Sequence, residues 1–408
     1  MMSIRNTLFV LLWGLLALPA IGLAAPSTAP RDSLHAVQKD SLRAVRKAQK
    51  DSLPKDNFFT RLIHGQIDRT FQKKIDHTEV AYPSYSNEGF FGLGAMASLL
   101  FRLDRTDSLM QASDASILVL AMLRGFFHVG VDGNIFFPGR RHRLHYEISY
   151  WRERPKFWGL DYASCVSQKP IEITRNEIEL NATYDYQFAK DFYVGAAVDF
   201  SYKVMNEIAD KTYLNGQKLS YITTGLGASV QYDSRDHVGN PTKGGNVILR
   251  GMVYPSFFGT NPQTICRITF QANYYQKLWK GAVLAFDAYT QINTPDAPWT
   301  LREEAGGKFR LRGYYEGRYI DNNLLSVQAE LRQKLFWRIG LAAFGGGGAL
   351  FPNFEALRAE HLLYTAGVGL RFEFKHNVNL RVDYGFGRRD PVSGRFTGAF
   401  VVTLNEAF

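Results

Sequence analysis

Residues 177–204 read EIELNATYDYQFAKDFYVGAAVDFSYKV and hold the clearest repeating pattern of the chain. From Ile178 to Phe188, apolar or aromatic residues alternate with polar ones, and the alternation resumes over 192–204. Successive side chains of a β-strand point to opposite faces, so a period of two predicts a strand with one apolar and one polar face. The stretch therefore predicts two neighbouring strands.

The same period continues from about residue 80 to residue 408. Further strands are expected near 89–102, 115–124, 128–137, 143–152, 221–233, 246–254, 267–278, 281–292, 323–335, 338–350, 363–374, 378–387 and 396–408. Their lengths suit a tilted strand that crosses a bilayer in about 9–11 residues. A soluble β-sandwich would hide its aromatic faces and protect its edges with charge, which this set does not do. We therefore expect an all-β fold, a transmembrane antiparallel β-barrel over 80–408.

These candidate strands are odd in number, whereas a closed antiparallel barrel with both ends on the periplasmic side needs an even number. One strand is therefore missed or merged. We expect about sixteen strands, with fourteen as the alternative.

The composition agrees with a barrel that is apolar outside and polar inside. Aromatic residues make up 14% of the chain, which also has 36 glycines, yet the mean hydropathy is slightly negative. The net charge of +10 is not gathered into a basic patch with interleaved aromatics, so no nucleic-acid partner is expected. Cys165 and Cys266 stand far apart without a metal-ligand pattern, so we expect no metal and no cofactor.

The first 79 residues differ from the remainder. Residues 1–25, with Arg5 before an apolar run and small residues at the end, predict a cleaved signal peptide. Residues 26–79 predict a periplasmic polar linker followed by an amphipathic helix, in which apolar residues recur every fourth position from Phe59 to Ile75. The sequence leaves open whether this short N-terminal helical segment lies on the membrane interface, plugs the barrel mouth, docks a partner or packs against the rim.

Residues 309–334, FRLRGYYEGRYIDNNLLSVQAELRQK, join an Arg-Gly-aromatic loop to a strand. Val327 and Leu331 belong to the apolar face of this strand, so Glu330 points to the opposite face. If that face lines a lumen, Arg312 on the loop can fold inward and meet Glu330 as a bidentate ion pair.

Three segments carry a family resemblance. The loop motif consists of Leu311, Arg312, Gly313 and Tyr314. Glu330 lies on the following strand, and a turn motif consists of Asp233, Arg235 and Asp236. In these segments the chain resembles the barrel of the BamA/TamA superfamily of bacterial outer-membrane proteins, over about residues 80–408. The resemblance implies that the loop folds back into the lumen and that Glu330 holds Arg312. The turn motif is expected to be a turn locked by its own charges rather than an ion site.

The chain departs from the family pattern in two places. Family members commonly have an aspartate on the next strand, where this chain has Gly346, so Arg312 is expected to depend on Glu330, with Asp383 as a candidate substitute. The family's insertases usually carry periplasmic POTRA repeats of about 75 residues, and no such repeat fits between the signal peptide and the barrel.

Barrel closure is expected to pair the strand near residues 89–101 with the strand at 396–408. This lateral seam contains Gly89, Gly92, Gly94 and Gly398, and ends at Phe408. Glycine weakens strand pairing, although glycines that only allow curvature are an equally good interpretation. The resemblance implies that the seam opens and that incoming strands pair with its edge. The last residue, in register with Phe400, resembles the signal by which outer-membrane barrels are recognised for assembly.

The resemblance implies a non-enzymatic protein of the outer membrane of a Gram-negative bacterium, involved in outer-membrane protein assembly or insertion, or in protein translocation. A passive pore or a structural barrel without insertase activity is the alternative. Expected partners are outer-membrane lipid and lipopolysaccharide, with nascent outer-membrane proteins or periplasmic factors as candidate clients. An embedded hydrolase is disfavoured because His142 and His145 point to opposite faces of a strand and no Ser-His-acid grouping emerges.

Overall fold

The computed structural model describes residues 70, 73–86, 90–107, 110–237, 240–375, 378–404 and 406–408. These belong to one compact unit, Asp56–Phe408. The expected signal peptide, the polar linker and most of the expected amphipathic helix lie outside the described residues, so these expectations stay predictions.

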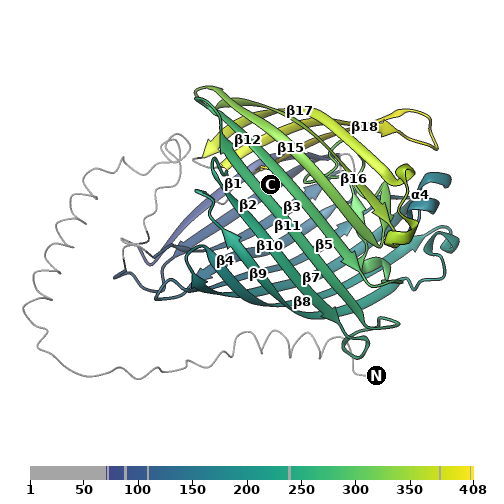
Figure 1. Cartoon of the computed structure of the whole chain (residues 1–408), viewed down its shortest axis with the longest axis horizontal. Coiled ribbons are helices and arrows are strands. Elements are labelled where there is room, and N and C mark those ends of the chain that lie inside the picture. Colours follow the sequence, from purple (N-terminus) through teal and green to yellow (C-terminus); the bar gives the residue numbers. More distant parts are fainter. Residues whose placement is uncertain are drawn as a thin grey trace, which may run out of the picture. The chain divides into compact units, whose positions relative to one another are not determined.

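Sixteen antiparallel strands close into a barrel within the described part of the chain (Figure 1). They are β1 (Ile75–Ser86), β2 (Phe90–Phe101), β3 (Ser113–Met122), β4 (Phe127–Phe136), β5 (His142–Glu153), β7 (Ile171–Ala189), β8 (Phe192–Ile208), β9 (Ser220–Asp233), β10 (Gly244–Tyr254), β11 (Ile265–Lys277), β12 (Ala282–Asn293), β15 (Asn323–Phe336), β16 (Ile339–Phe351), β17 (Leu362–Lys375), β18 (Val378–Arg389) and β19 (Phe396–Leu404). Each strand pairs with the next in the chain, and β19 returns to β1. The predicted fold class and strand number are confirmed.

Short elements lie in the connections. They are β6 (Lys156–Phe157), α4 (Tyr162–Ser167), β13 (Glu303–Ala305), β14 (Tyr319–Asp321) and the 3₁₀ turns Lys211–Leu214, Ser256–Phe258, Trp299–Leu301, Phe354–Ala356 and Ala359–His361. No helix among the described residues is long and apolar enough to span a membrane.

The strand missing from the sequence prediction is β1. It begins at Ile75, which the sequence analysis placed at the end of the amphipathic helix, so the barrel starts five residues before the expected boundary at residue 80. The strand expected near 89–101 is therefore the second one, β2. Ile75 continued the fourfold spacing of the preceding segment, and IDHTEVAYPSYS has no regular apolar face, so periodicity alone did not reveal the strand.

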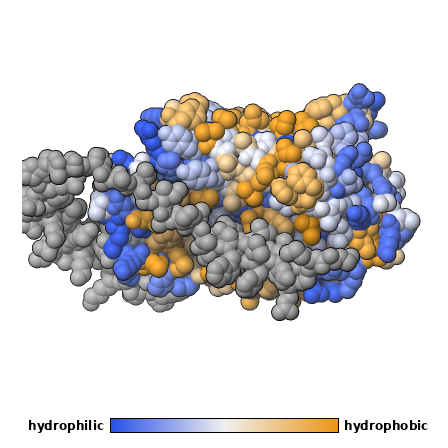
Figure 2. All heavy atoms as spheres, turned by 90° about the horizontal axis from the view of Figure 1, so that it is seen from below, coloured by the Kyte–Doolittle hydropathy of each residue, from blue (hydrophilic) through white to orange (hydrophobic). Residues whose placement is uncertain are grey.

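The barrel wall separates an apolar exterior from a polar interior. On the face that Figure 2 shows, hydrophobic residues form a band between hydrophilic residues at the two ends. On β15, Val327 is 62% exposed, whereas the neighbouring Gln328 and Glu330 are buried. This alternation matches the lipid-facing and lumen-facing sides of a membrane barrel.

The two ends of the barrel differ. Several turns of a few residues, such as 190–191 and 337–338, join strands at the end where β1 begins and β19 finishes, whereas the two longest connections, 154–170 and 294–322, lie at the other end. In outer-membrane barrels the short turns are periplasmic and the long loops extracellular. The longest connection, residues 294–322, contains β13 and β14 and enters the lumen.

An apolar cluster lies inside the barrel at the long-loop end. It contains Trp299, Leu311, Tyr314 and Tyr319 of the lumen loop, Phe157, Trp158, Leu160, Tyr162 and Cys165 around α4, and the wall residues Ile173, Met205, Tyr221, Leu324, Leu350 and Leu363. These wall residues come from β7–β9 and from β15–β17, on roughly opposite sides of the ring. The cluster therefore joins two walls across the lumen.

Candidate functional site: an arginine loop inside the barrel

The loop backbone lies directly against the barrel wall. Gly313 adopts a φ of +116°, a conformation that L side chains rarely take. A Cβ atom added there would lie 2.7 Å from the carbonyl carbon of Phe386, and one added at Gly385 would lie 2.5 Å from the carbonyl oxygen of Arg312. Two glycines thus allow the loop to touch β18. The hydroxyl of Thr365 donates to the same Arg312 carbonyl.

The Arg312 guanidinium is enclosed by two carboxylates and a ring. Its Nη1 donates to Oε2 of Glu330 at 2.6 Å and to Oδ2 of Asp383 at 2.8 Å. Its Cζ lies 3.6 Å from the centroid of the Phe344 ring. All three charged side chains are no more than 1% exposed. Only Nη1 makes these contacts, so the expected pairing of Arg312 and Glu330 is confirmed but its expected bidentate geometry is wrong. Stacking on a ring suits arginine better than lysine.

The next residue of the motif fixes the loop to a different pair of strands. The Tyr314 hydroxyl donates to the Tyr364 carbonyl at 2.8 Å and accepts from the Arg388 backbone amide at 2.8 Å. Burial raises the pKa of Tyr314 to about 12, so the hydroxyl keeps its proton.

The ion pairs extend beyond the loop into a network on the barrel wall. Arg371 donates to Glu330 at 3.0 Å, to Asp383 at 2.6 Å and to Glu406 at 2.8 Å. Arg332 donates to Glu330 at 2.8 Å and lies 3.6 Å from Glu406. Four arginines, 312, 332, 371 and 381, thus meet the three carboxylates of residues 330, 383 and 406. The network links the loop to β15, β17, β18 and the C-terminal residues.

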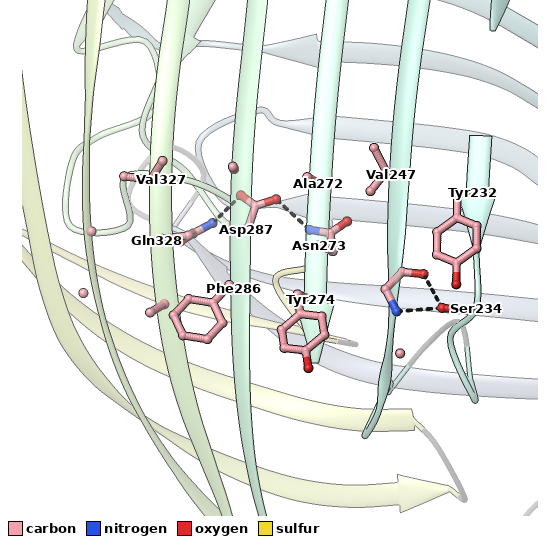
Figure 3. Close-up of a pocket in the computed structure, with 16 residues that line it drawn as sticks. Tyr232, Ser234, Val247, Ala272, Asn273, Tyr274, Phe286, Asp287, Val327 and Gln328 are labelled. Atoms are coloured by element: carbon pink, nitrogen blue, oxygen red, sulfur yellow. Dashed lines mark hydrogen bonds between the residues drawn. The ribbon is translucent and has the colours of Figure 1, made fainter. Parts of the chain in front are cut away.

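A second contact holds the preceding loop residues. Figure 3 shows Asp287 of β12 between Gln328 of β15 and Asn273 of β11, hydrogen-bonded to both. Gln328 also donates to the Phe309 carbonyl at 3.0 Å, and Arg310 Nε donates to Asp287 at 3.2 Å. Residues 309–314 are therefore clamped along β12, β15, β17 and β18.

Asp383 takes the place of the aspartate that the family pattern puts at residue 346. A Cβ at Gly346 would lie 2.7 Å from the Cβ of Gln328, so the Gln328 side chain fills that space. Of the network residues, Arg332, Arg371, Arg381 and Glu406 were not assigned to the site from the sequence. Alternation marks Arg371 as lumen-facing, but only the strand register reveals which lumen-facing residues meet.

The turn between β9 and β10 contains the second predicted motif. Arg235 donates from Nε and Nη2 to the two oxygens of Asp233 at 2.9 and 2.8 Å. The Asp236 carboxylate accepts from the Thr242 backbone amide at 2.9 Å and from its hydroxyl at 2.5 Å. Although burial raises the pKa of Asp236, the Thr242 hydrogen bonds outweigh burial and hold the pKa below its usual value. The motif closes a turn. Within the described residues, no group of three or more His, Cys, Asp or Glu is arranged to hold a metal ion.

The closing seam lies between β1 and β19, one strand away from the predicted place. Gly92 and Gly94 lie on β2, which pairs with β1 along twelve residues, while Gly89 lies outside the described residues. The Tyr82 ring lies over Gly94, which leaves no space for a Cβ there. On β19, Gly398 pairs with Phe386 of β18.

Within the described residues, the seam has a single register pair, Tyr85 with Val402. Continuing that antiparallel register places Pro83 opposite Leu404, so residues 75–82 extend past the end of β19. At the other end, residues 396–400 extend past the end of β1. Pro83 also lacks the amide hydrogen that a fully paired strand needs, which suits an edge. In the part of the chain that the structure describes, both strands therefore present an unpaired edge.

Phe408 does not continue the outer face of β19. Phe400 is 37% exposed on that face, and an unbent strand would place Glu406 there as well. Instead Glu406 is 7% exposed and accepts from Arg371, while Arg332 donates to the Phe408 carbonyl at 2.9 Å. A carboxylate is costly against lipid and is stabilised by the lumen arginines, so residues 406–408 turn inward.

A family model described as the Omp85 superfamily domain matches residues 137–398. The comparison with curated proteins gives no match. Among solved structures, BamA from Haemophilus ducreyi lacking POTRA domains 1–3 is similar with a TM-score of 0.55 and 10% identity, over 82% of this chain and 70% of that one.

Two further solved structures share the fold. CdiB from Acinetobacter baumannii has a TM-score of 0.54 at 13% identity, over 82% of this chain and 60% of its own. CdiB from Escherichia coli has a TM-score of 0.56 at 14% identity, over 82% and 63%. The chain thus spans less than two thirds of the length of either CdiB, and likeness at these identities concerns the fold alone.

Proposed function

The chain belongs to the Omp85 superfamily, and on that premise we propose that it works in the outer membrane of a Gram-negative bacterium, in the assembly or insertion of outer-membrane proteins or in protein translocation. The β1/β19 seam is the proposed route. The role is non-enzymatic and needs no cofactor.

The observation that carries this proposal is the seam with one register pair. Every other neighbouring pair of the sixteen strands has at least eight register pairs, as in β18 with β19 and β3 with β4. Unpaired strand edges offer backbone donors and acceptors to an incoming strand, which adds by β-augmentation. The proposed clients are nascent outer-membrane proteins, and the proposed surroundings are outer-membrane lipid and lipopolysaccharide.

The apolar cluster argues against the alternative function of a passive pore. Residues from opposite walls meet across the long-loop end, and hydrophobic packing excludes the water that a solute path requires. A barrel with only a structural role remains the competing function, and the seam experiment separates it from the proposed one.

A disulfide across the seam tests the proposal. Tyr85→Cys and Val402→Cys place two thiols on directly opposed residues, close enough to cross-link. The exposed Cys266 is replaced by Ser, and Cys165 is retained because burial raises the pKa of its thiol to about 12 and keeps it unreactive. The protein in liposomes is expected to speed the folding of a urea-unfolded client barrel when reduced, and to lose this effect when oxidised. Heat-modifiable migration of the client is the measurement.

The matched control places the disulfide inside the wall, with Ala95→Cys and Val119→Cys on the opposed strands β2 and β3. Oxidation of this variant should leave client folding unchanged. Equal client folding by the oxidised and reduced seam variants would contradict the proposed route.

A further inference from the structure

A small cavity lies beneath the arginine network, at the end of the barrel with the short turns. Its volume is about 280 Å³. Residues near the ends of β11, β12, β15, β16, β17 and β18 form its walls, with Asn240 and Thr242 of the β9–β10 turn beside them. Its charged residues on these strands belong to the lumen-facing side. Arg332, Arg371 and Glu406 line it as well, so the network forms part of its surface.

The cavity carries excess positive charge. Its cations are Lys277, Arg332, Lys334, Arg338 and Arg371, and its anions are Glu373 and Glu406. The formal charge of this lining is therefore +3, five cations less two carboxylates. Lys334 pairs with Glu373 at 2.6 Å, and Arg371 pairs with Glu406 at 2.8 Å.

One buried donor in this lining has no acceptor. Arg332 is 7% exposed, and its Nη1 has no hydrogen-bond partner among the described residues. A buried guanidinium N–H without a partner is costly, so an oxygen acceptor at this position would stabilise the site.

The chain itself shows how this site holds a peptide carboxylate. Glu406 follows the last strand, and its two oxygens accept from Arg371 Nε at 2.8 Å and from Asn379 Nδ2 at 2.6 Å. Charge-assisted hydrogen bonds of this kind are the strong ones in proteins. The ammonium of the exposed Lys277 is available to a second carboxylate, and the buried, unpaired Nη1 of Arg332 adds positive charge beside it.

We propose that this cavity is a binding site for the carboxylate of an acidic peptide segment that enters the lumen from the periplasmic end. A peptide is favoured over a lipid headgroup because the charged lining faces the lumen rather than the lipid. This inference rests on the proposed function, because a client protein would supply the peptide. Its test is an equilibrium measurement that does not depend on client folding.

The experiment uses the full chain in neutral detergent and a fluorescently labelled hexaglutamate peptide, with binding followed by anisotropy. Hexaglutamine of the same length is the reference peptide. We expect hexaglutamate alone to bind, and Lys277→Gln with Lys334→Gln to weaken binding about three- to tenfold, as loss of two partly exposed charge pairs predicts. Raising the ionic strength should weaken binding further.

The matched control is Lys190→Gln, in the β7–β8 turn at the same end of the barrel but outside the cavity lining. It should bind hexaglutamate like the unaltered chain, and heat-modifiable migration should show all variants folded. Equal binding of hexaglutamate and hexaglutamine would overturn the proposal. Equal losses of hexaglutamate affinity in the control and in the double variant would overturn it as well. So would a chain that binds short-chain phosphatidylglycerol but does not bind hexaglutamate. Client folding that fails while hexaglutamate still binds would count against the proposed function alone.

Discussion

Arg312 shows how the environment of one residue can decide the position of a whole loop. Its charge is compensated by Glu330 and Asp383, and its flat face lies on Phe344. A charge buried this deeply is stable only with partners, because transfer from water costs several kcal/mol per ion. The loop that carries Arg312 therefore stays where both carboxylates can reach it.

Replacing Glu330 by Gln should destabilise the barrel by about 3–5 kcal/mol, because one buried partner is removed while Arg312, Arg332 and Arg371 keep their charges. Urea unfolding in detergent, followed by heat-modifiable migration, measures the loss. Glu179→Gln is the control. This change breaks the ion pair between Glu179 and Lys203, in which the Glu179 side chain is 27% exposed. The free energy of unfolding should therefore fall by less than about 1 kcal/mol. Similar losses of unfolding free energy in the two variants would show that the Arg312–Glu330 contact stabilises the barrel no more than a partly exposed ion pair does.

The sequence predicted some of this site and missed the remainder for a physical reason. Arg312 and Glu330 were predicted to meet, since one strand face had to be polar and the loop preceded it. Asp383 could not be placed and Arg371 was not singled out, because both partner choices depend on which residues of β17 and β18 stand opposite each other. Register results from the closed barrel as a whole.

Among the elements, β1 and β19 depart most from the regular pattern. The central strands were predictable because each has one lipid face and one lumen face. In β1 the alternation is weak and Pro83 interrupts it, and the end of β19 turns inward instead of continuing outward. Edges and ends experience fewer constraints from neighbours, so their sequences indicate their structure less clearly.

Replacing Glu406 by Gln should loosen both the last strand and the loop. Arg371 donates to Glu406 and also to Asp383, so removal of the Glu406 charge leaves Arg371 partly uncompensated and lowers the cost of opening by about 3 kcal/mol. Hydrogen exchange measured by mass spectrometry should become faster at residues 396–404 and 309–313.

The control for that variant is Glu373→Gln. Its pair with Lys334 lies at the same end of the barrel, but the lysine is 56% exposed, so exchange at both segments should stay close to that of the unaltered chain. Unchanged exchange at 309–313 in the Glu406 variant would show that the loop and the last strand are not coupled through Arg371.

On the scale of the whole molecule, the two ends of the lumen differ in kind. At the long-loop end an apolar cluster joins residues from opposite walls, whereas the other end has a charged cavity beneath the arginine network. The lumen loop contributes Leu311 and Tyr314 to the cluster and Arg312 to the arginine network above the cavity. The apolar cluster across one end and the weakly paired seam are the two features behind the proposed lateral path.

That asymmetry predicts how the barrel conducts ions. The unaltered chain in planar bilayers should show no steady open-channel current. Ala305 of β13 pairs with Tyr319 of β14, so residues 306–318 can be replaced by a two-glycine turn that keeps this hairpin. The shortened loop removes Leu311 and Tyr314 from the cluster, and a steady current should appear. Shortening the β10–β11 loop at the exposed Phe257 and Phe258 should leave the barrel closed. A large steady current through the unaltered chain would instead favour the passive pore, because the cluster would then fail to exclude water.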